Sequence, residues 1–389
     1  MKVLYITDIY EIGGAVQSFL EMTSTLKSVY GVEPIIVVSK KGKVSERCRI
    51  EGNECHIAKY RQFYVNAGST IPRQIIRKIF KPYLLLRYII GNKIAINILK
   101  KEVDFSTIDI IHSNTERNDI GAILSKEYGI PHVWHIRVFG EPDYGCFSLK
   151  SKYIDFMNRN ADKFICISKA EQEYWVKKGL TSNKSIVIYN GIDSDKYSST
   201  HQFNEEGNLK IVIAGFISPK KGQIQAIEAL AKLRNEYGYR VTLDLYGTGA
   251  KEYIISLKNI IKKSNLVNEI RFMGQANNLP EKLINYDVGL MCSEAEAFGR
   301  VTIEYMMSGL CVIASDAGAN PEIIKSNYNG FLYQHGDVND LKNKLKFVID
   351  NKKKIISIGK NAKKCAFEKY TKYENAKNIR KLYEEVIKR

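Results

Sequence analysis

Two carboxylates, Glu296 and Glu304, stand eight residues apart where the sequence pattern changes from loop to helix. Glu296 precedes Phe298-Gly299, a loop signal, and apolar residues recur at helical spacing from Val301 onward. The first turn of a helix has unpaired N–H groups, which attract phosphate. One carboxylate before such a terminus and one inside it suit a ligand with a sugar, a diphosphate and a ribose. An ordinary amphipathic helix with solvated glutamates is the alternative.

Cationic side chains stand at two boundaries between predicted elements of the second half. Lys221-Gly222 follows the predicted strand 209–214, and Arg300 adjoins the start of the helix. Preorganised cations stabilise charge that develops on a leaving group. Lys220 and Lys221 cannot be distinguished by residue type, so either is an ordinary solvent-exposed lysine in the alternative interpretation.

Glycine and histidine residues stand at the ends of predicted strands in the first half, where a ligand would bind. Gly13 and Gly14 follow the first predicted strand and precede a helix, which places flexible backbone beside a helix N-terminus. His135 ends a predicted strand and would point toward a ligand there. His112 is its rival, with a mainly structural role expected, and Arg137 is a further candidate for binding a diphosphate or an acceptor.

Asp193 and Asp195 have the spacing of carboxylates that hold a divalent cation beside a diphosphate. They follow an Asn-Gly-Ile segment rather than a strand, and an aspartate in that position is typical of a turn. We therefore expect no metal site. The charge of the leaving group is assigned to Lys221, Arg300 and helix dipoles instead.

The elements that must position these residues alternate between strand and helix. The predicted strands of the first half are 3–7, 34–39, 108–112, 132–137, 164–168 and 185–189. Those of the second half are 209–214, 240–246, 270–273, 288–292, 312–315 and 330–333. Helical periodicity lies between them, as in 15–29, 223–236 and 253–264. This order indicates parallel sheets covered by helices, whose ligands bind at the carboxyl ends of the strands.

Length and composition predict two domains in a reducing compartment. The 389 residues exceed what one core usually supports. We place the domains at 1–195 and 196–370, with 371–389 as a C-terminal helix. The seven cysteines contain no Cys-x-x-Cys pair, which argues against disulfides and a zinc site. Without a signal peptide or a run of about 18 apolar residues, a cytoplasmic protein is expected.

The net charge of +17 is unevenly distributed, since residues 72–101 carry eight cations and no acidic residue. Apolar residues are interleaved with them, among them Phe80, Tyr83, Leu84 and Leu85. We expect these four to insert at the headgroup level of an anionic membrane. No nucleic-acid motif accompanies the charge, so a nucleic-acid partner is not expected. A solvated helix face is the alternative.

Residues 293–309, with their continuation 311–322, resemble the retaining glycosyltransferases of family 4, which have the GT-B fold. The resemblance covers the second half well, but the first half only at the Gly-Gly loop and around His135. It implies two doubly wound Rossmann-like domains facing across a cleft, with the last helix crossing back to the first domain. It also implies transfer of a hexosyl unit from a nucleotide sugar, expected to be a UDP-sugar. The acceptor would be a glycan, expected to be lipid-linked, in bacterial surface-polysaccharide synthesis at the inner face of the cell membrane.

The resemblance also assigns roles to residues. Glu296 would bind hydroxyls of the donor sugar and steady charge at its anomeric carbon, and Glu304 would accept both ribose hydroxyls. Lys221 would neutralise the diphosphate, and His135 would lie beside the transferred sugar. The remaining donor contacts fall on Gly13, Gly14, Gly247, Met273, Gly274, Phe298, Gly299, Arg300 and Val301. No cofactor or metal is implied, and the leaving phosphate would take the acceptor proton.

One departure from the family pattern leaves two other functions open. The family usually has an arginine where this chain has Phe216, and we expect Arg300 to compensate. A nucleotide-sugar epimerase of the same architecture would need acid–base groups and no acceptor. A non-catalytic nucleotide-sugar-binding subunit is conceivable, although both glutamates and Lys221 are present. A dehydrogenase is excluded because residues 11–16 lack the Gly-x-Gly-x-x-Gly pattern.

Overall fold

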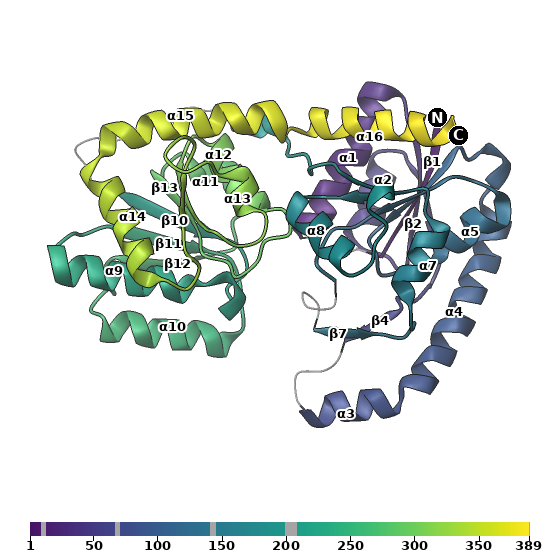
Figure 1. Ribbon diagram of the computed structural model, residues 1–389, viewed down its shortest axis with the longest axis horizontal. Coiled ribbons are helices and arrows are strands. Elements are labelled where there is room, and N and C mark those ends of the chain that lie inside the picture. Colours follow the sequence, from purple (N-terminus) through teal and green to yellow (C-terminus); the bar gives the residue numbers. More distant parts are fainter. Residues whose placement is uncertain (9–12, 67–70, 141–144, 199–207, 389) are drawn as a thin grey trace. The chain divides into compact units, whose positions relative to one another are not determined.

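The computed structural model describes residues 1–8, 13–66, 71–140, 145–198 and 208–388. They form two compact units, one of residues 1–191 and 372–389 and the other of residues 192–371 (Figure 1). The first boundary between the units lies four residues before the one predicted from the sequence, and the second lies one residue after its predicted position. The reason is that Ile192 pairs with Thr371 in a parallel bridge, and its N–H donates to the Tyr370 carbonyl. These contacts tie the linker to the second unit.

The first unit is built on a parallel sheet in the order β3-β2-β1-β5-β6-β8-β9. Its strands are β1 (Lys2–Thr7), β2 (Glu33–Val38), β3 (Glu54–Ile57), β5 (Ile110–Asn114), β6 (His132–His135), β8 (Lys163–Cys166) and β9 (Ser185–Val187). All were predicted to within two residues at each end except β3. That edge strand was missed because its sequence, Glu-Cys-His-Ile, is half polar and only partly buried. The strand order reverses between β1 and β5, where ligands of such sheets bind.

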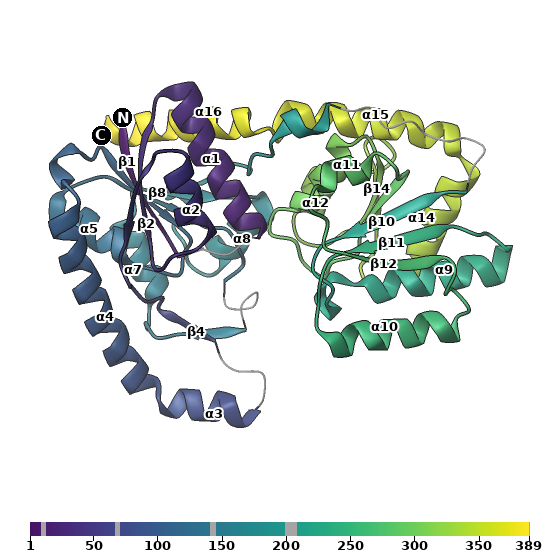
Figure 2. The ribbon, with the colours of Figure 1, turned by 180° about the vertical axis from the view of Figure 1, so that it is seen from behind.

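Helices cover both faces of this sheet (Figure 2). They are α1 (Gly14–Tyr30), α2 (Lys43–Ile50), α4 (Lys81–Glu102), α5 (Ile120–Tyr128), α7 (Tyr153–Asn160), α8 (Lys169–Lys177) and α16 (Lys372–Ile387). Because side chains alternate along a strand, Val3 and Tyr5 of β1 pack with α1 and α16, whereas Leu4 and Ile6 pack with α4 and α5. The C-terminal helix is therefore part of the first core.

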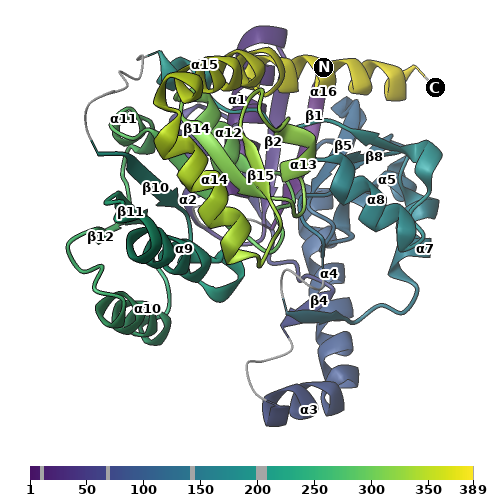
Figure 3. The same ribbon diagram turned by 60° about the vertical axis from the view of Figure 1, so that its left-hand side comes forward.

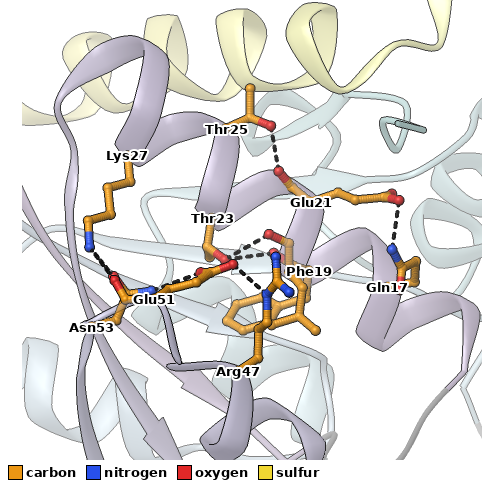
Figure 4. Close-up of polar contacts among 10 residues, drawn as sticks. Gln17, Phe19, Glu21, Thr23, Thr25, Lys27, Arg47, Glu51 and Asn53 are labelled. Carbon is orange, nitrogen blue, oxygen red and sulfur yellow. Dashed lines mark hydrogen bonds and ion pairs between the residues drawn. The ribbon is translucent and has the colours of Figure 1, made fainter. Parts of the chain in front are cut away.

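Polar contacts brace α1 internally and join its last turn to a neighbouring segment (Figure 4). Gln17 Nε2 donates to Glu21 Oε1 at 2.8 Å, and the Thr25 hydroxyl donates to the Glu21 carbonyl at 2.7 Å. Near the end of the helix, Lys27 Nζ donates to Asn53 Oδ1 at 2.5 Å. This last contact links α1 to the turn before β3, so the helix that begins at the predicted glycine loop is anchored at its far end.

The second unit has a parallel sheet in the order β12-β11-β10-β13-β14-β15. Its strands are β10 (Lys210–Ala214), β11 (Thr242–Tyr246), β12 (Ile270–Gly274), β13 (Val288–Met291), β14 (Cys311–Ser315) and β15 (Phe331–Tyr333). Each was predicted to within two residues. The order reverses between β10 and β13, which makes their carboxyl ends the expected ligand site of this unit.

Helices of the second unit pack in two groups. They are α9 (Gln223–Tyr237), α10 (Lys251–Lys263), α11 (Leu279–Leu283), α12 (Arg300–Met307), α13 (Asn320–Ile323), α14 (Val338–Asp350) and α15 (Lys352–Lys369). Helix α9 contacts α10 and α14, whereas α12 and α15 contact each other and β14 (Figure 3). Each sheet is thus sandwiched between helices, as the GT-B expectation requires of its two Rossmann-like domains.

The basic stretch of the first unit folds as α3 (Ile71–Ile79) followed by α4, beside a small antiparallel sheet of β4 (Tyr64–Asn66) and β7 (Cys146–Ser148). Among the described helices, none is long and apolar enough to cross a membrane. Phe80 and Tyr83 are more than half exposed, as expected of membrane-inserting residues. Leu84 and Leu85 are only partly exposed, because both pack on the cluster formed by Phe63, Tyr64, Tyr88 and Leu149.

Candidate active site residues of each unit

Lys221 and Glu296 form an ion pair in the second unit. Lys221 ends a short 3₁₀ turn after β10, and Glu296 lies in the loop after β13. These are the two strands between which the strand order reverses. The side chains are 34% and 14% exposed, so a ligand can reach the pair from solvent. The structure therefore brings together a cation and a carboxylate that are 75 residues apart in sequence.

Two glycines allow these loops to approach closely. Gly222, with φ +66°, packs so tightly that a Cβ there would lie 2.1 Å from the Cys292 carbonyl oxygen. A Cβ on Gly318 would lie 2.4 Å from the backbone nitrogen and oxygen of Glu296. The Ala319 N–H also donates to the Glu296 carbonyl at 2.7 Å. The backbone of Glu296 is thus held from the β14 side, and larger residues would displace it.

The start of α12 carries the second predicted carboxylate. Gly299 precedes the helix in the left-handed region, with φ +76°. Arg300 Nε donates to Glu304 Oε1 at 3.0 Å, across one helical turn. Both side chains are partly shielded, at 16% and 12% exposed. Arg300, Glu304 and the N–H groups of the first turn therefore share one helix end, where the helix dipole favours an anion.

The other predicted donor contacts lie at the same carboxyl edge of the sheet. Gly247 follows β11, and its N–H donates to the carbonyl of Gly274 at the end of β12, at 2.7 Å. Met273 is 42% exposed and Phe216 is 58% exposed. The Phe298 ring, by contrast, is buried against Tyr370, with ring centroids 6.2 Å apart. Val301 is partly buried in the first turn of α12.

Four buried residues form a chain of contacts in the first unit. His112 Nε2 lies 3.2 Å from His135 Nδ1, and His112 Nδ1 lies 2.6 Å from the Tyr383 hydroxyl of α16. Arg137 Nη2 lies 3.4 Å from the same His135 Nδ1. His112, for which mainly a structural role was expected, is therefore a direct partner of His135. Sequence alone offered no sign that Tyr383 takes part.

Donor and acceptor balance assigns the protons of both imidazole rings. A guanidinium only donates, so His135 Nδ1 is an acceptor. His112 Nε2 then carries the proton that it shares with His135, and His112 Nδ1 is the acceptor that faces the Tyr383 hydroxyl, which also lies 3.3 Å from the Tyr5 hydroxyl. His135 Nε2 carries the remaining proton and has no partner among the described residues. Burial, and next the charge of Arg137, hold the pKa of both histidines well below 6.5. His135 is therefore a neutral N–H donor.

Arg137 is a buried cation held by neutral groups. Its Nε donates to Asn114 Oδ1 at 2.5 Å, and its Nη1 donates to Asn190 Oδ1 at 2.7 Å. The third partner is His135 Nδ1. Burial lowers the pKa of Arg137 to about 9, and the charge of the nearby Glu171 carboxylate acts in the opposite direction. An anionic ligand would stabilise this buried cation further.

Asp8 is a candidate that sequence reasoning missed. It follows β1 beside β5, at the point where the order of the first sheet reverses, and is 2% exposed. Its Oδ1 accepts from the Thr115 hydroxyl at 2.8 Å and from Arg117 Nη2 at 3.1 Å. The signal was an acidic residue directly after a buried strand. Gly13 and Gly14 begin α1 nearby in sequence and are exposed, whereas residues 9–12 lie outside the described ranges.

The Asp193 and Asp195 pair lies at the start of the second unit. Asp193 precedes a 3₁₀ turn, Ser194–Tyr197, and its Oδ2 lies 3.4 Å from Lys196 Nζ. Within the described part of the chain, no group of three or more His, Cys, Asp or Glu side chains is arranged to hold a metal ion.

Comparison with known proteins gives two family matches, which together span residues 12–365. The model described as Glycosyltransferase Family 4 matches residues 12–196, and the model described as Glycosyl transferases group 1 matches residues 194–365. An uncharacterized glycosyltransferase of Methanocaldococcus jannaschii is 28% identical over 351 residues, covering 87% of this chain and 92% of that protein. The UDP-Gal:alpha-D-GlcNAc-diphosphoundecaprenol alpha-1,3-galactosyltransferase of Escherichia coli is 25% identical over 310 residues, covering 75% and 78%.

Solved structures agree with the fold. The crystal structure of Anabaena Alr3699/HepE in complex with UDP superposes with a TM-score of 0.79 at 22% identity. The match covers 99% of this chain and 100% of that one. At this identity the likeness establishes the architecture of two Rossmann-like domains.

Proposed function

The chain belongs to the group 1 glycosyltransferases of family 4, and on that premise we propose that it moves a hexosyl unit from a UDP-sugar to a lipid-linked glycan, with the α configuration retained. The proposal places the reaction in bacterial surface-polysaccharide synthesis, at the cytoplasmic face of the membrane. The Escherichia coli relative, named for a UDP-sugar donor and a diphosphoundecaprenol acceptor, supports both substrate classes. Its 25% identity leaves the particular sugar open.

The observation that carries the proposal is the Lys221–Glu296 ion pair at the strand reversal of the second sheet. In the proposed reaction Lys221 turns to the donor diphosphate, where a preorganised cation stabilises the negative charge of the leaving group. Glu296 then binds sugar hydroxyls and steadies positive charge at the anomeric carbon. The leaving phosphate takes the acceptor proton, so the reaction needs no general base from the protein.

Three further groups complete the proposed chemistry. Glu304 accepts from the two ribose hydroxyls, a role that suits a carboxylate with two oxygens. Arg300, its partner on α12, adds the cation that Phe216 does not supply. His135 offers its Nε2–H to a hydroxyl of the transferred sugar. As a neutral donor it would orient that sugar rather than remove a proton from the acceptor.

The exposed face of α3 and α4 supports an acceptor held at a membrane. Its apolar side chains, each at least 50% exposed, are Ile75, Ile76, Ile79, Phe80, Tyr83, Leu86, Ile89, Ile90 and Ile94. Cations accompany them on the same two helices, including Arg77, Lys78, Lys81 and Lys93. Apolar groups flanked by cations match an anionic lipid surface, which attracts the charges and takes up the side chains.

A panel of nucleotide sugars tests the proposed function. UDP, GDP, ADP and TDP derivatives are added to the purified chain, and the melting temperature and released products are measured. UDP-sugars should stabilise the chain most, since a ligand that binds only the native state raises stability by mass action. NMR of the transferred sugar should show retained configuration. Stabilisation by a different nucleotide only, or release of an epimerised nucleotide sugar without acceptor, would overturn the proposal and favour the epimerase alternative.

A further inference from the structure

A pocket of about 500 Å³ opens in the first unit, and none of the candidate site residues named above is among its described lining residues. Lys40 reaches it from the segment after β2, Lys59 and Arg61 from the segment after β3, and Arg87 from α4. Four of its thirteen described lining residues are thus cations, and none of the thirteen is acidic. The volume is within the range of small-ligand sites, and the position beyond strand carboxyl ends is where α/β sheets bind ligands.

Arg61 is positioned for this pocket by α4. Its backbone N–H donates to Asn92 Oδ1 at 2.7 Å, and Asn92 Nδ2 donates to its carbonyl at 3.1 Å. Asn92 is buried, so this pair of bonds fixes the segment after β3 on the helix. Gly91 leaves room for the arginine side chain, since a Cβ there would lie 3.2 Å from Arg61 Nε. Cations from separate elements are therefore gathered at one pocket, where an anion would relieve their mutual repulsion.

A buried phenol adds a hydrogen-bond donor to the pocket lining. Tyr60 is 5% exposed, and its hydroxyl has no hydrogen-bond partner among the described residues. Burial, and next the charge of Asp8, raise the pKa of Tyr60, so the hydroxyl keeps its proton. The hydroxyl of Tyr88, by contrast, is already used by Asp119. A buried polar group without a partner is costly, and a ligand oxygen would satisfy it.

Helix α4 joins this pocket to the apolar face described above. Leu84, Arg87 and Tyr88 line the pocket, whereas Leu86 and Ile90 of the same helix are at least 50% exposed. A molecule with an anionic head and an apolar chain would fit both surfaces at once. Arginine suits such a head because its planar fork matches phosphate oxygens.

We propose that this pocket binds the diphosphate of a prenyl-diphosphate-linked acceptor, with Lys59, Arg61 and Arg87 as its main ligands. The prenyl chain follows the apolar face of α4 toward the bilayer. This assignment rests on the proposed function, of which it specifies the acceptor class. The same pocket could take a phosphate from a soluble polyol-phosphate chain, so the experiment compares the two sources.

The test is calorimetric titration of the full chain with geranyl diphosphate at saturating UDP, so that a donor site cannot contribute. The pocket variant combines Lys59→Gln, Arg61→Gln and Arg87→Gln. Its matched control combines Lys101→Gln, Lys126→Gln and Lys177→Gln, which remove the same charge from exposed positions of the first unit outside the pocket. We expect the pocket variant to bind at least tenfold more weakly than wild type and the control to stay within twofold. Tyr60→Phe should weaken binding severalfold.

Three results would overturn the assignment: unchanged binding by the pocket variant, an equal loss in the control variant, or tighter binding of ribitol 5-phosphate than of geranyl diphosphate. The stabilisation of the pocket variant by UDP, measured in parallel, should equal that of wild type. If UDP fails to stabilise even the wild-type chain, the proposed donor is wrong, and the titration without UDP still decides whether the pocket binds a prenyl diphosphate.

Discussion

The imidazoles of His112 and His135 lie 3.2 Å apart, Nε2 to Nδ1, on the neighbouring strands β5 and β6. Because His135 Nδ1 also faces Arg137, the proton of His135 lies on Nε2, which has no partner in the described part of the chain. His112 in turn depends on Tyr383, which lies 271 residues away on the C-terminal helix. The C-terminal helix thus supplies the hydroxyl partner of the histidine that contacts His135 in the first unit.

Removing the hydroxyl in Tyr383→Phe should therefore affect both stability and turnover. The substitution leaves His112 Nδ1 buried without a donor, at a cost of about 1–3 kcal/mol in the free energy of unfolding. It also releases the His112 ring that donates to His135 Nδ1, so kcat should fall by roughly tenfold if His135 orients the sugar. Urea unfolding and steady-state kinetics measure the two effects, and Tyr239→Phe, at a solvent-exposed hydrogen bond with Asp350, is the control. Nitrogen-15 NMR that placed the His135 proton on Nδ1 in the wild-type chain would contradict the assignment.

Substitution of Glu296 and substitution of Glu304 should have different effects on turnover and on UDP affinity. Glu296→Ala is expected to reduce kcat by roughly 10²-fold and to leave UDP affinity nearly unchanged, because its interactions strengthen in the transition state. Glu304→Ala should instead weaken UDP binding by about 1.5–3 kcal/mol, the scale of hydrogen bonds to a charged group. Kinetics and UDP titration separate the two effects. Glu294→Ala, at an exposed position two residues before Glu296, is the control. Equal losses of UDP affinity with unchanged kcat in both variants would refute the assigned roles.

Activity should survive an excess of EDTA. In the proposed mechanism Lys221, Arg300 and the start of α12 stabilise the negative charge of the diphosphate, so no divalent cation is needed for this purpose. Transfer is assayed after dialysis against EDTA and again after Mn²⁺ or Mg²⁺ is restored. Complete loss in EDTA with recovery on adding the metal would revive Asp193 and Asp195 as ligands.

Buried histidines should make the first unit sensitive to acid. Burial lowers the pKa of His132 from 6.5 to about 4, and the pKa values of His112 and His135 lie well below 6.5. The unfolded chain gains protons as the pH falls through 6.5, whereas the folded chain does not. The free energy of unfolding should therefore decrease from about pH 6.5 toward pH 4, by up to about 1.4 kcal/mol per pH unit for each histidine. In urea titrations His135→Gln should flatten this slope, and a curve parallel to wild type would contradict the account.

The exposed face of α3 and α4 should bind anionic vesicles. Each cation near such a surface contributes on the order of 1 kcal/mol, so co-sedimentation should be strong at low salt, weak at high salt and weak with neutral lipid. Combined Arg77→Gln, Lys78→Gln, Lys81→Gln and Lys93→Gln should abolish it. The control replaces four exposed lysines of the second unit, namely Lys251, Lys262, Lys263 and Lys353. If the wild-type chain ignores anionic vesicles at low salt, the face is solvated and a soluble acceptor becomes the better proposal.

Local sequence patterns were sufficient to predict most of the strands and their order along the chain. Short apolar strands and helical periodicity are local patterns. Twelve of the strands could therefore be predicted to within two residues at each end, and their alternation with helices indicated the α/β class. The segment around Glu296 and Glu304 could be related to a known family because its residues are contiguous. The partly polar edge strand β3 was missed, because half of its residues give no apolar signal and only the neighbouring β2 defines it.

Contacts between residues far apart in the sequence became visible only in the folded chain. The ion pair of Lys221 with Glu296 and the contact of His112 with Tyr383 join positions 75 and 271 residues apart. Helical pattern also failed to separate Leu84 and Leu85, which pack inward, from Leu86 and its exposed neighbours. The sequence of a basic amphipathic helix does not show which of its apolar residues pack against the core. That choice depends on the complementary surface, here the cluster around Phe63, which the chain assembles only on folding.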